Sequence, residues 1–310
     1  MTDLKLFRLD ASGRDVEPRG SAVALEVELQ RRIETGMESM LGVRFLASGY
    51  PTGPWRRGRI DSLGLDENNT PVVVEYKKGS DNGVLSQAVS YLSWLRSARH
   101  EFEALVKEEL GTEAAAAIDW RNPRMVCIAA GFSRHDRVAV HDLNKRVDLV
   151  RYRVFDGGLL RLLLVESASG SASPAPAQRQ PRQRGVAVDT DDGAKSVRAT
   201  VDAAPACLRA LYGDLDEVLT ASGEVEVDSK QHYIAYRRMV NIASVIFRPK
   251  HEAILVYLKV APDTVSLEEG FSRDMHGIGH LGTGALEVRI ASAADLEKAG
   301  PLIRRAIVTV

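Results

Sequence analysis

Two acids and a lysine in the segment GRIDSLGLDENNTPVVVEYKKGS (residues 58–80) have types and spacing suited to binding a divalent cation. Asp61 precedes Glu75 by fourteen residues, and Lys77 follows two residues after Glu75. Adjacent carboxylates repel each other unless a hard cation lies between them, and Mg²⁺ accepts such ligands together with water and phosphate oxygens. A neighbouring ammonium can polarise an attacking water or offset charge that develops on a phosphate. The three residues therefore suit metal-assisted hydrolysis of a phosphate ester.

This chemistry requires that Asp61 and Glu75 face each other on paired strands. The apolar pattern predicts strands at about 59–65 and 71–77 on either side of the turn residues DENNT. With those five residues as the loop of an antiparallel pair, Asp61 lies directly opposite Glu75 and on the same face. A loop one residue longer or shorter would turn Asp61 to the other face.

A solvated, charged end of a hairpin is the alternative interpretation, because a glutamate two residues before a lysine is expected by chance in a chain of this length. The segment EVEVDSK supplies a second example, in which Asp228 and Lys230 follow alternating apolar residues. The first segment differs because it has a pairing strand that carries an acid. It also lies between an acidic helix predicted at 22–41 and a long helix predicted at 84–109.

Taken together, these features resemble the PD-(D/E)xK nuclease superfamily, and within it the NucS/EndoMS-like branch. The resemblance covers about residues 22–166. The residues that carry it are an acid, a Glu-x-Lys, and a glutamine and a tyrosine on the following helix: Asp61, Glu75, Lys77, Gln87 and Tyr91. It implies an α/β restriction-endonuclease-like domain with a central mixed sheet. It also implies a Mg²⁺-dependent (or Mn²⁺-dependent) DNA endonuclease, a deoxyribonuclease that acts in DNA repair or in defence against foreign DNA.

The resemblance also implies roles for individual residues. The metal ligands are Asp61, Glu75 and a helix acid that matches Glu26 in LEVELQ, with Glu28 as the alternative. Catalytic roles extend to Lys77 and Gln87. Mismatch specificity does not carry over, because the known mismatch enzymes have a dimerisation domain before the nuclease, whereas this chain starts almost directly at the nuclease helix. The rival interpretation is a noncatalytic nucleic-acid-binding or regulatory protein that retains the fold.

A basic run, PWRRGRID, immediately precedes the first acid. Its arginines, Arg56, Arg57 and Arg59, are predicted to bind the phosphates of DNA, and Trp55 is available to stack on a base. Tyr91 shares a helix face with Gln87 and is predicted to join the nucleic-acid-binding residues. The alternative interpretation of the run is a solvated loop.

A segment rich in Ser, Pro, Gln and Ala divides the chain. It predicts a nuclease-like domain at 1–166, a flexible linker at 167–199 and a smaller α+β domain at 200–310. The last domain resembles a bacterial domain of unknown function that is labelled a predicted transport protein. It is expected to take part in recognition or assembly, through a homodimer or a protein partner. A small anion-binding cleft is predicted there from three residues: Tyr233, Arg237 and Arg273.

The composition is that of an ordinary soluble protein with room for two domains: 310 residues, 45% apolar and 27% charged. No apolar run approaches the roughly 20 residues of a membrane helix, and the N-terminus lacks a signal-peptide layout. We therefore expect a cytoplasmic protein with no membrane partner. Cys127 and Cys207 lie far apart, which argues against a disulfide framework or a cysteine metal site. Because the net charge is -1, any DNA contacts must come from local basic patches.

Overall fold

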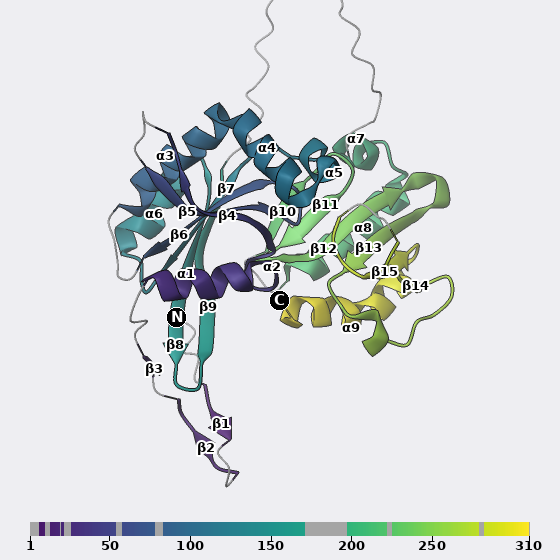
Figure 1. Ribbon diagram of the computed structural model, residues 1–310. Coiled ribbons are helices and arrows are strands. Elements are labelled where there is room, and N and C mark those ends of the chain that lie inside the picture. The colour runs from purple at the N-terminus through teal and green to yellow at the C-terminus, as the bar shows by residue number, and fades with distance from the viewer. Residues whose placement is uncertain are drawn as a thin grey trace, which may run out of the picture. The chain divides into compact units, whose positions relative to one another are not determined.

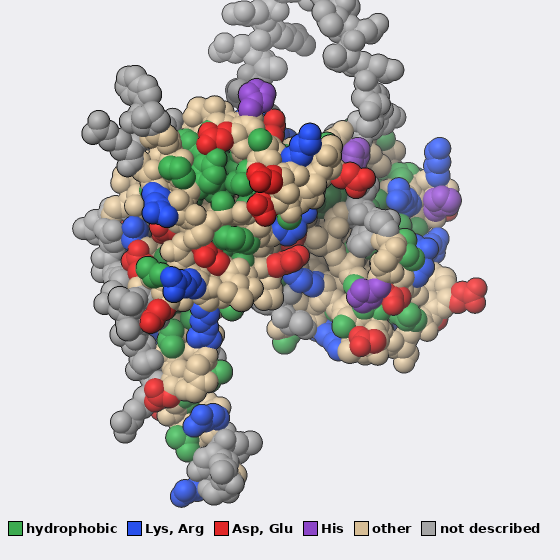
Figure 2. Space-filling model, in the orientation of Figure 1, with side chains coloured by type: hydrophobic (Ala, Val, Ile, Leu, Met, Phe, Trp, Pro, Cys, Tyr) green, Lys and Arg blue, Asp and Glu red, His purple; other side chains and the backbone are tan. Residues whose placement is uncertain are grey.

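The computed structural model describes most of the chain in two compact units, Met1–Ser171 and Ala172–Val310 (Figure 1). The described residues are 6–9, 13–18, 20–21, 26–53, 58–77, 83–170, 197–221, 225–278 and 282–309. Among them, no helix combines the length and the apolar character that crossing a membrane requires. On the face drawn in Figure 2, Lys and Arg side chains are interspersed with Asp and Glu, as the net charge of -1 leads one to expect.

The first unit is built on a seven-stranded sheet in the order β3-β8-β7-β6-β5-β4, with β9 also paired to β8. Its strands are β3 (Gly20–Ser21), β4 (Val43–Pro51), β5 (Arg59–Asp66), β6 (Pro71–Lys77), β7 (Arg124–Ala129), β8 (Arg146–Phe155) and β9 (Leu159–Ser169). Strands β6, β7 and β8 are parallel, whereas the other pairs are antiparallel. A short separate hairpin consists of β1 (Arg8–Leu9) and β2 (Asp15–Val16). The predicted α/β class with a central mixed sheet is thus confirmed.

Helices cover both faces of this sheet. They are α1 (Glu26–Thr35), α2 (Met37–Leu41), α3 (Val84–Ser97), α4 (Arg99–Leu110), α5 (Thr112–Ala116) and α6 (Arg134–Asp142). Val73 of β6 lies in one core with Tyr91 of α3, and Tyr76 of β6 points to the opposite face, where Ser62 bonds to Glu34 of α1. Helices α1 and α3 therefore sandwich the β5–β6 hairpin.

Both long helices predicted from the sequence are interrupted. The helix expected at 22–41 divides at Gly36, a residue that costs a helix about 1 kcal/mol relative to alanine, and residues 22–25 lie outside the described chain. The helix expected at 84–109 divides at Ala98, whose backbone leaves helical geometry (φ -103°, ψ 28°).

The register of the β5–β6 hairpin decides which side chains meet. Leu65 lies opposite Pro71, so the loop is the predicted DENNT, and the ladder continues through the pair Ser62 and Val74. Within the loop, Asp66 Oδ1 accepts hydrogen bonds from the backbone N–H groups of Asn68 and Thr70, at 2.8 and 2.9 Å. This side chain fixes the turn and hence the register, and the predicted pairing is confirmed.

The second unit has a six-stranded, fully antiparallel sheet in the order β10-β11-β12-β13-β15-β14. Its strands are β10 (Glu226–Ser229), β11 (Ile234–Arg237), β12 (Asn241–Arg248), β13 (Ala253–Leu258), β14 (Ser272–Asp274) and β15 (Leu286–Ile290). Its helices are α7 (Val197–Asp202), α8 (Ala206–Thr220) and α9 (Ala293–Thr309), with short 3₁₀ turns at Pro249–His251 and Pro262–Thr264. The sheet and the flanking helices make an α+β unit.

Two local features of this unit bear on the sequence predictions. Ser292 accepts a hydrogen bond from the backbone N–H of Asp295 at 3.2 Å and so caps the start of α9. The predicted linker, 167–199, is shorter at both ends, because β9 runs through Ser169 and α7 begins at Val197. The rest of the linker, residues 171–196, lies outside the described chain.

Candidate active site

The two predicted acids meet where β5 separates from β6. The backbone N–H of Asp61 donates to Oε1 of Glu75 at 3.1 Å, and the backbone N–H of Tyr76 donates to Oδ2 of Asp61 at 3.0 Å. The ladder between the strands stops one pair earlier, at Ser62 and Val74. Each carboxylate thus replaces a backbone acceptor of the neighbouring strand, and the two side chains occupy the gap that opens between the strands.

Glu75 is an unusual acid because it is buried against another acid. Only 2% of its surface is exposed, whereas Asp61 is partly exposed. Burial first, and then the charge of Asp61, raises the pKa of Glu75 to about 8, and the charge of Lys77 opposes that rise. Without a further cation, the surroundings of Glu75 therefore favour its protonated form.

Helix α3 brings two predicted residues to this gap. Tyr91 is 7% exposed, and its hydroxyl donates to the backbone oxygen of Arg59 at 3.1 Å. Burial, followed by the charges of Glu75 and Asp61, raises the pKa of Tyr91 to about 12, while a hydrogen bond from Gln87 opposes that rise. The Oε1 atom of Gln87 is buried and accepts no hydrogen bond within the described part of the chain. That oxygen is an acceptor available to a ligand or a water.

Helix α1 contributes residues other than the predicted Glu26. The amide of Gln30 donates to the backbone oxygen of Asp61 at 2.9 Å, and Glu34 accepts a hydrogen bond from Ser62 at 2.6 Å. The charge of Glu26 instead acts on Tyr152 of β8, whose pKa it raises after burial. The described residues contain no group of three or more His, Cys, Asp or Glu side chains able to hold a metal ion. Glu26 is therefore not joined to the Asp61–Glu75 pair in this structure.

Sequence reasoning missed Gln30 and Glu34, although a signal for them exists. Leu29 and Ile33 form the buried stripe of α1, and the residue after each of them lies at the edge of that stripe. Such an edge position faces the neighbouring strand. Glu28, the alternative helix acid, is exposed.

The predicted DNA-binding residues are only partly described. Arg56 and Arg57 lie outside the described residues, as does Trp55. Arg59 is exposed, and its Nε donates to the backbone oxygen of Gly49 at 2.8 Å. Because Tyr91 is buried and bonded to the backbone of Arg59, its position in the structure is that of a support for β5.

The cleft predicted in the second unit is not assembled. Arg237 is 2% exposed and pairs with Glu226 at 3.1 Å, whereas Arg273 pairs with Glu287 at 3.0 Å. Arg237 lies on β11 and Arg273 on β14, with β12, β13 and β15 between them. Tyr233 packs in a small apolar cluster around Tyr257. The two arginines are therefore neutralised separately, and the strand order keeps them apart.

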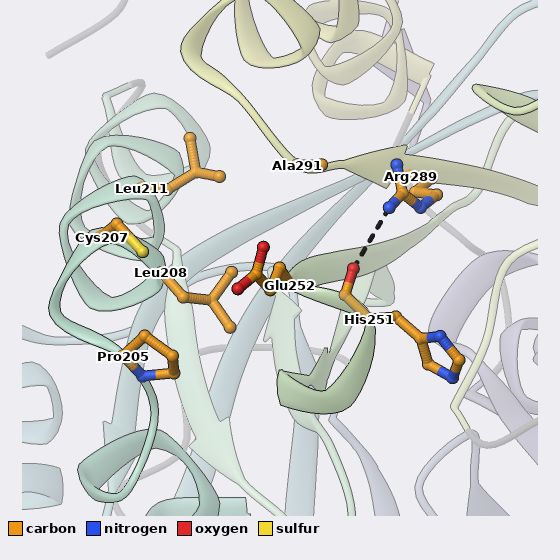
Figure 3. Close-up of a pocket in the computed structure, with 8 residues that line it drawn as sticks. All are labelled: Pro205, Cys207, Leu208, Leu211, His251, Glu252, Arg289 and Ala291. Carbon is orange, nitrogen blue, oxygen red and sulfur yellow. Dashed lines mark hydrogen bonds between the residues drawn. The ribbon is translucent and has the colours of Figure 1, made fainter.

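A cavity of about 220 Å³ lies elsewhere in the second unit (Figure 3). Its lining includes Cys207 and Leu208 at the start of α8, together with Glu252 and Arg289. Arg289 donates to the backbone oxygen of His251 at 3.2 Å. None of the residues predicted for the cleft lines this cavity.

Comparison with known proteins finds distant similarity. No family model matches the chain. An uncharacterised protein of Haemophilus influenzae is 21% identical over 286 residues, which cover 91% of this chain and 93% of that protein.

Two solved structures match in part, each with a TM-score of 0.28: an EndoMS–dsDNA2 complex and a repair endonuclease from Pyrococcus abyssi. Sequence identities are 18% and 19%. The matches cover 42% and 44% of this chain, and 47% and 54% of those chains, so the chain spans about half the length of each.

Proposed function

We propose that the first unit is a divalent-metal-dependent DNA endonuclease with a restriction-endonuclease-like fold, which hydrolyses phosphodiester bonds in DNA repair or in defence against foreign DNA. The observation that carries this proposal is the Asp61–Glu75 pair. Glu75 is 2% exposed, and its burial first and then the charge of the adjacent Asp61 raise its pKa to about 8. A protein gains nothing in stability from two acids placed in this way, so a ligand that reverses the repulsion accounts for the arrangement.

The donor atoms of this pair fit a hard divalent cation. Both side chains offer carboxylate oxygens, and neither histidine nor thiolate joins them among the described residues, which favours Mg²⁺ or Mn²⁺ over softer metals. Asp61 and Glu75 would hold the metal. Glu26, the third predicted ligand, forms no metal-binding group of three with the pair among the described residues, so we assign it no ligand role. When bound, the cation supplies a Lewis acid and lowers the pKa of water at the site.

The surrounding residues have roles that follow from their positions. Lys77 is two residues beyond Glu75 on the same face of β6, and its positive charge acts on that carboxylate. Its ammonium offsets negative charge that develops on a phosphate. The buried Oε1 of Gln87 accepts a hydrogen bond from the attacking water, and Tyr91 holds Gln87 and the backbone of Arg59 in place. The side chains of Arg56, Arg57 and Arg59 contact phosphates of the DNA.

One observation favours the noncatalytic alternative, in which the protein binds nucleic acid or regulates another protein. The described residues contain no group of three or more His, Cys, Asp or Glu side chains able to hold a metal ion. A single carboxylate pair binds Mg²⁺ weakly unless substrate phosphates complete the coordination shell. Titration calorimetry of the full chain with Mg²⁺ or Mn²⁺, with and without DNA, separates the two functions, because the alternative predicts no heat of metal binding in either case.

Cleavage assays test the proposal directly. Purified full-length protein is incubated with plasmid, single-stranded, branched and mismatched DNA in Mg²⁺ or Mn²⁺. Asp61→Asn, Glu75→Gln and Lys77→Ala are each expected to abolish cleavage while the protein stays folded. The matched control is Asp228→Ala combined with Lys230→Ala, which removes a 2.8 Å ion pair from the similar EVEVDSK segment and is expected to leave cleavage intact. Cleavage that persists in all three site variants would overturn the assignment.

A further inference from the structure

Three arginines gather on the β8–β9 hairpin of the first unit. Arg151 and Arg153 lie on β8, and Arg161 of β9 is directly opposite Arg153. Strand β7 ends at Ala129, which is opposite Arg151, so the hairpin continues beyond the end of its parallel neighbour. Figure 1 shows this hairpin extending past α1, away from the rest of the sheet. At its turn, Arg32 of α1 donates to the backbone oxygen of Gly158 at 2.5 Å.

The arginines lie on the same face of the sheet as the acid pair. In the register of the parallel strands, Lys77 is the partner of Ala129, and Ala129 is in turn the partner of Arg151. Partner residues on neighbouring strands point their side chains to the same face of the sheet, and so does every second residue along one strand. Arg151, Arg153 and Arg161, the cross-strand partner of Arg153, therefore lie on the face of Lys77. The core on this face confirms the assignment, because Leu149, two residues before Arg151, packs in one cluster with Tyr91.

These arginines lack the acidic partners that other arginines of the unit have. Arg124 pairs with Asp148, Arg121 with Asp119, and Arg137 with Glu166. Within the described chain, no hydrogen bond or ion pair is recorded for the three hairpin arginines, and Arg153 is exposed. Like charges directly opposite each other destabilise a strand pair. The facing pair of Arg153 and Arg161 is therefore a place where a bound anion removes a repulsion.

We propose that this arginine face (Arg151, Arg153 and Arg161) binds the phosphate backbone of the DNA on one side of the bond that is cut. The proposal rests on the nuclease function of the acid pair. Two strand spacings separate Lys77 from Arg151, which puts their Cα atoms about 10 Å apart. Leu149 of β8 is in register with Glu75 through Cys127, and Arg153 lies four residues further along β8. The Cα atoms of Glu75 and Arg153 are therefore about 17 Å apart. One strand of a duplex carries a phosphate for each roughly 3.4 Å of axis, so the face reaches about three to five nucleotides from the site.

The test measures DNA binding separately from cleavage. Fluorescence anisotropy gives the affinity of the full chain for labelled duplex DNA at several salt concentrations, with Ca²⁺ in place of Mg²⁺. The variant Arg153→Gln/Arg161→Gln removes the facing pair, and Arg121→Gln/Arg137→Gln is the matched control with the same change in charge. Each lost phosphate contact lowers the slope of log K against log salt by about 0.9. The facing-pair variant is therefore expected to lose about 1.8 from the slope and to bind at least tenfold more weakly at 0.1 M salt.

Further variants sharpen the outcome. Arg153→Lys/Arg161→Lys keeps both charges and is expected to retain most of the slope, because the contacts are with phosphates and not with bases. Thermal melting without DNA should show the glutamine variant to be no less stable than the wild type, since it loses a repulsion. An unchanged slope in the folded glutamine variant, equal to that of the control, would overturn the proposal.

Failure of the arginine face and failure of the nuclease function give different results. If the site variants abolish cleavage but the glutamine variant binds like its control, only the arginine face is overturned. If the slope falls by the expected amount while Asp61→Asn and Glu75→Gln still cleave, the arginine face is supported as a DNA-binding surface and the acid pair is not the nuclease site.

Discussion

Two of the buried carboxylates of the first sheet, Asp148 and Glu75, have opposite surroundings. Asp148 of β8 is 1% exposed, and Arg124, equally buried, lies 2.6 Å from it through one guanidinium nitrogen and 2.7 Å through another. Ser167 donates to its second oxygen at 2.6 Å. Glu75, on β6, is buried to the same degree, but its neighbour is the acid Asp61. One carboxylate is neutralised within the protein, and the other is not.

This difference separates a structural carboxylate from a functional one. The two charges of a buried ion pair neutralise each other, so breaking the pair lowers the free energy of unfolding. A buried acid beside another acid lowers the stability of the fold unless a ligand binds to the pair. Removing such an acid therefore weakens ligand binding and not the fold. Asp228 belongs to the first kind, because it pairs with Lys230 at 2.8 Å although its sequence resembles that of the second. Burial alone would not distinguish Asp148 from Glu75, and sequence pattern alone would not distinguish Asp228 from Glu75.

The largest expected effect is the loss of cleavage in Glu75→Gln. The amide keeps the size of the side chain but removes a charged oxygen ligand, so we expect cleavage of plasmid DNA in Mg²⁺ to fall roughly 10²- to 10³-fold or more. In contrast, Asp148→Asn should leave cleavage by the protein that remains folded within a few-fold of wild type. A Glu75→Gln enzyme with near wild-type rates would show that the two carboxylates do not differ in function.

The next largest effect is on stability, and it is expected at Asp148 and not at Glu75. Asp148→Ala leaves the guanidinium of Arg124 buried without its counter-charge, so we expect the free energy of unfolding to fall by about 3 to 5 kcal/mol. Urea denaturation of the full chain, monitored by circular dichroism, measures this change. The double variant Arg124→Met/Asp148→Leu should recover much of the loss. A loss below about 1 kcal/mol in Asp148→Ala would contradict a structural role for this pair.

The pH dependence of stability should also separate the two carboxylates. Because the pKa of Glu75 is raised to about 8 from the ordinary value of 4.5, the folded state keeps a proton that the unfolded state releases. Stability of the metal-free protein is therefore expected to fall as the pH rises from about 4.5 to about 8, by at most about 1.4 kcal/mol per unit. Below about 4.5 both states are protonated, and the penalty disappears.

Glu75→Gln removes this titrating group and is the natural reference. The difference in unfolding free energy between Glu75→Gln and wild type, measured without divalent cations, should grow in favour of the variant from pH 5 to pH 8. Adding Mg²⁺ should stabilise the wild type at pH 8 and leave the variant unchanged, because a ligand that binds only the folded state raises its stability. A difference that is constant across this range would contradict the shifted pKa.

The sequence was sufficient to predict contacts between residues that are close in the chain, and less so for contacts between distant residues. The DENNT loop and the alternation of apolar residues were enough to predict that Asp61 and Glu75 meet, because both are local to one hairpin. Helix α1 was harder, since the resemblance selected Glu26, whereas the residues that reach the hairpin are Gln30 and Glu34. Gln30 lies about one turn and Glu34 about two turns beyond Glu26 along the same helix, so the docking of the helix decides which residue reaches the hairpin.

The failed cleft in the second unit has the same cause on a larger scale. Arg237 and Arg273 were grouped from their residue types, but β14 pairs with β15 at one edge of the sheet and β11 lies four strands away. No local sequence pattern predicts this order of strands in the sheet. The arginine face on β8 and β9 was also missed, although the facing of Arg153 and Arg161 is local to the hairpin: the register runs unbroken from Phe155 opposite Leu159 to Arg153 opposite Arg161.

The smallest effect concerns Tyr91, which the sequence assigned to DNA binding and the structure buries at 7% exposure. Its hydroxyl donates to the backbone oxygen of Arg59 at 3.1 Å, so Tyr91→Phe should lower the free energy of unfolding by about 0.5 to 1.5 kcal/mol. Cleavage should fall only a few-fold, because β5 still carries Asp61, and the salt dependence of DNA binding should not change. Tyr50→Phe is the matched control, since its hydroxyl bonds to Glu101 at 2.7 Å in a more exposed position and its loss should cost less. Weaker DNA binding without a loss of stability in Tyr91→Phe would instead make this hydroxyl a contact to DNA, and would move Tyr91 from the scaffold of the acid pair to its ligand-binding surface.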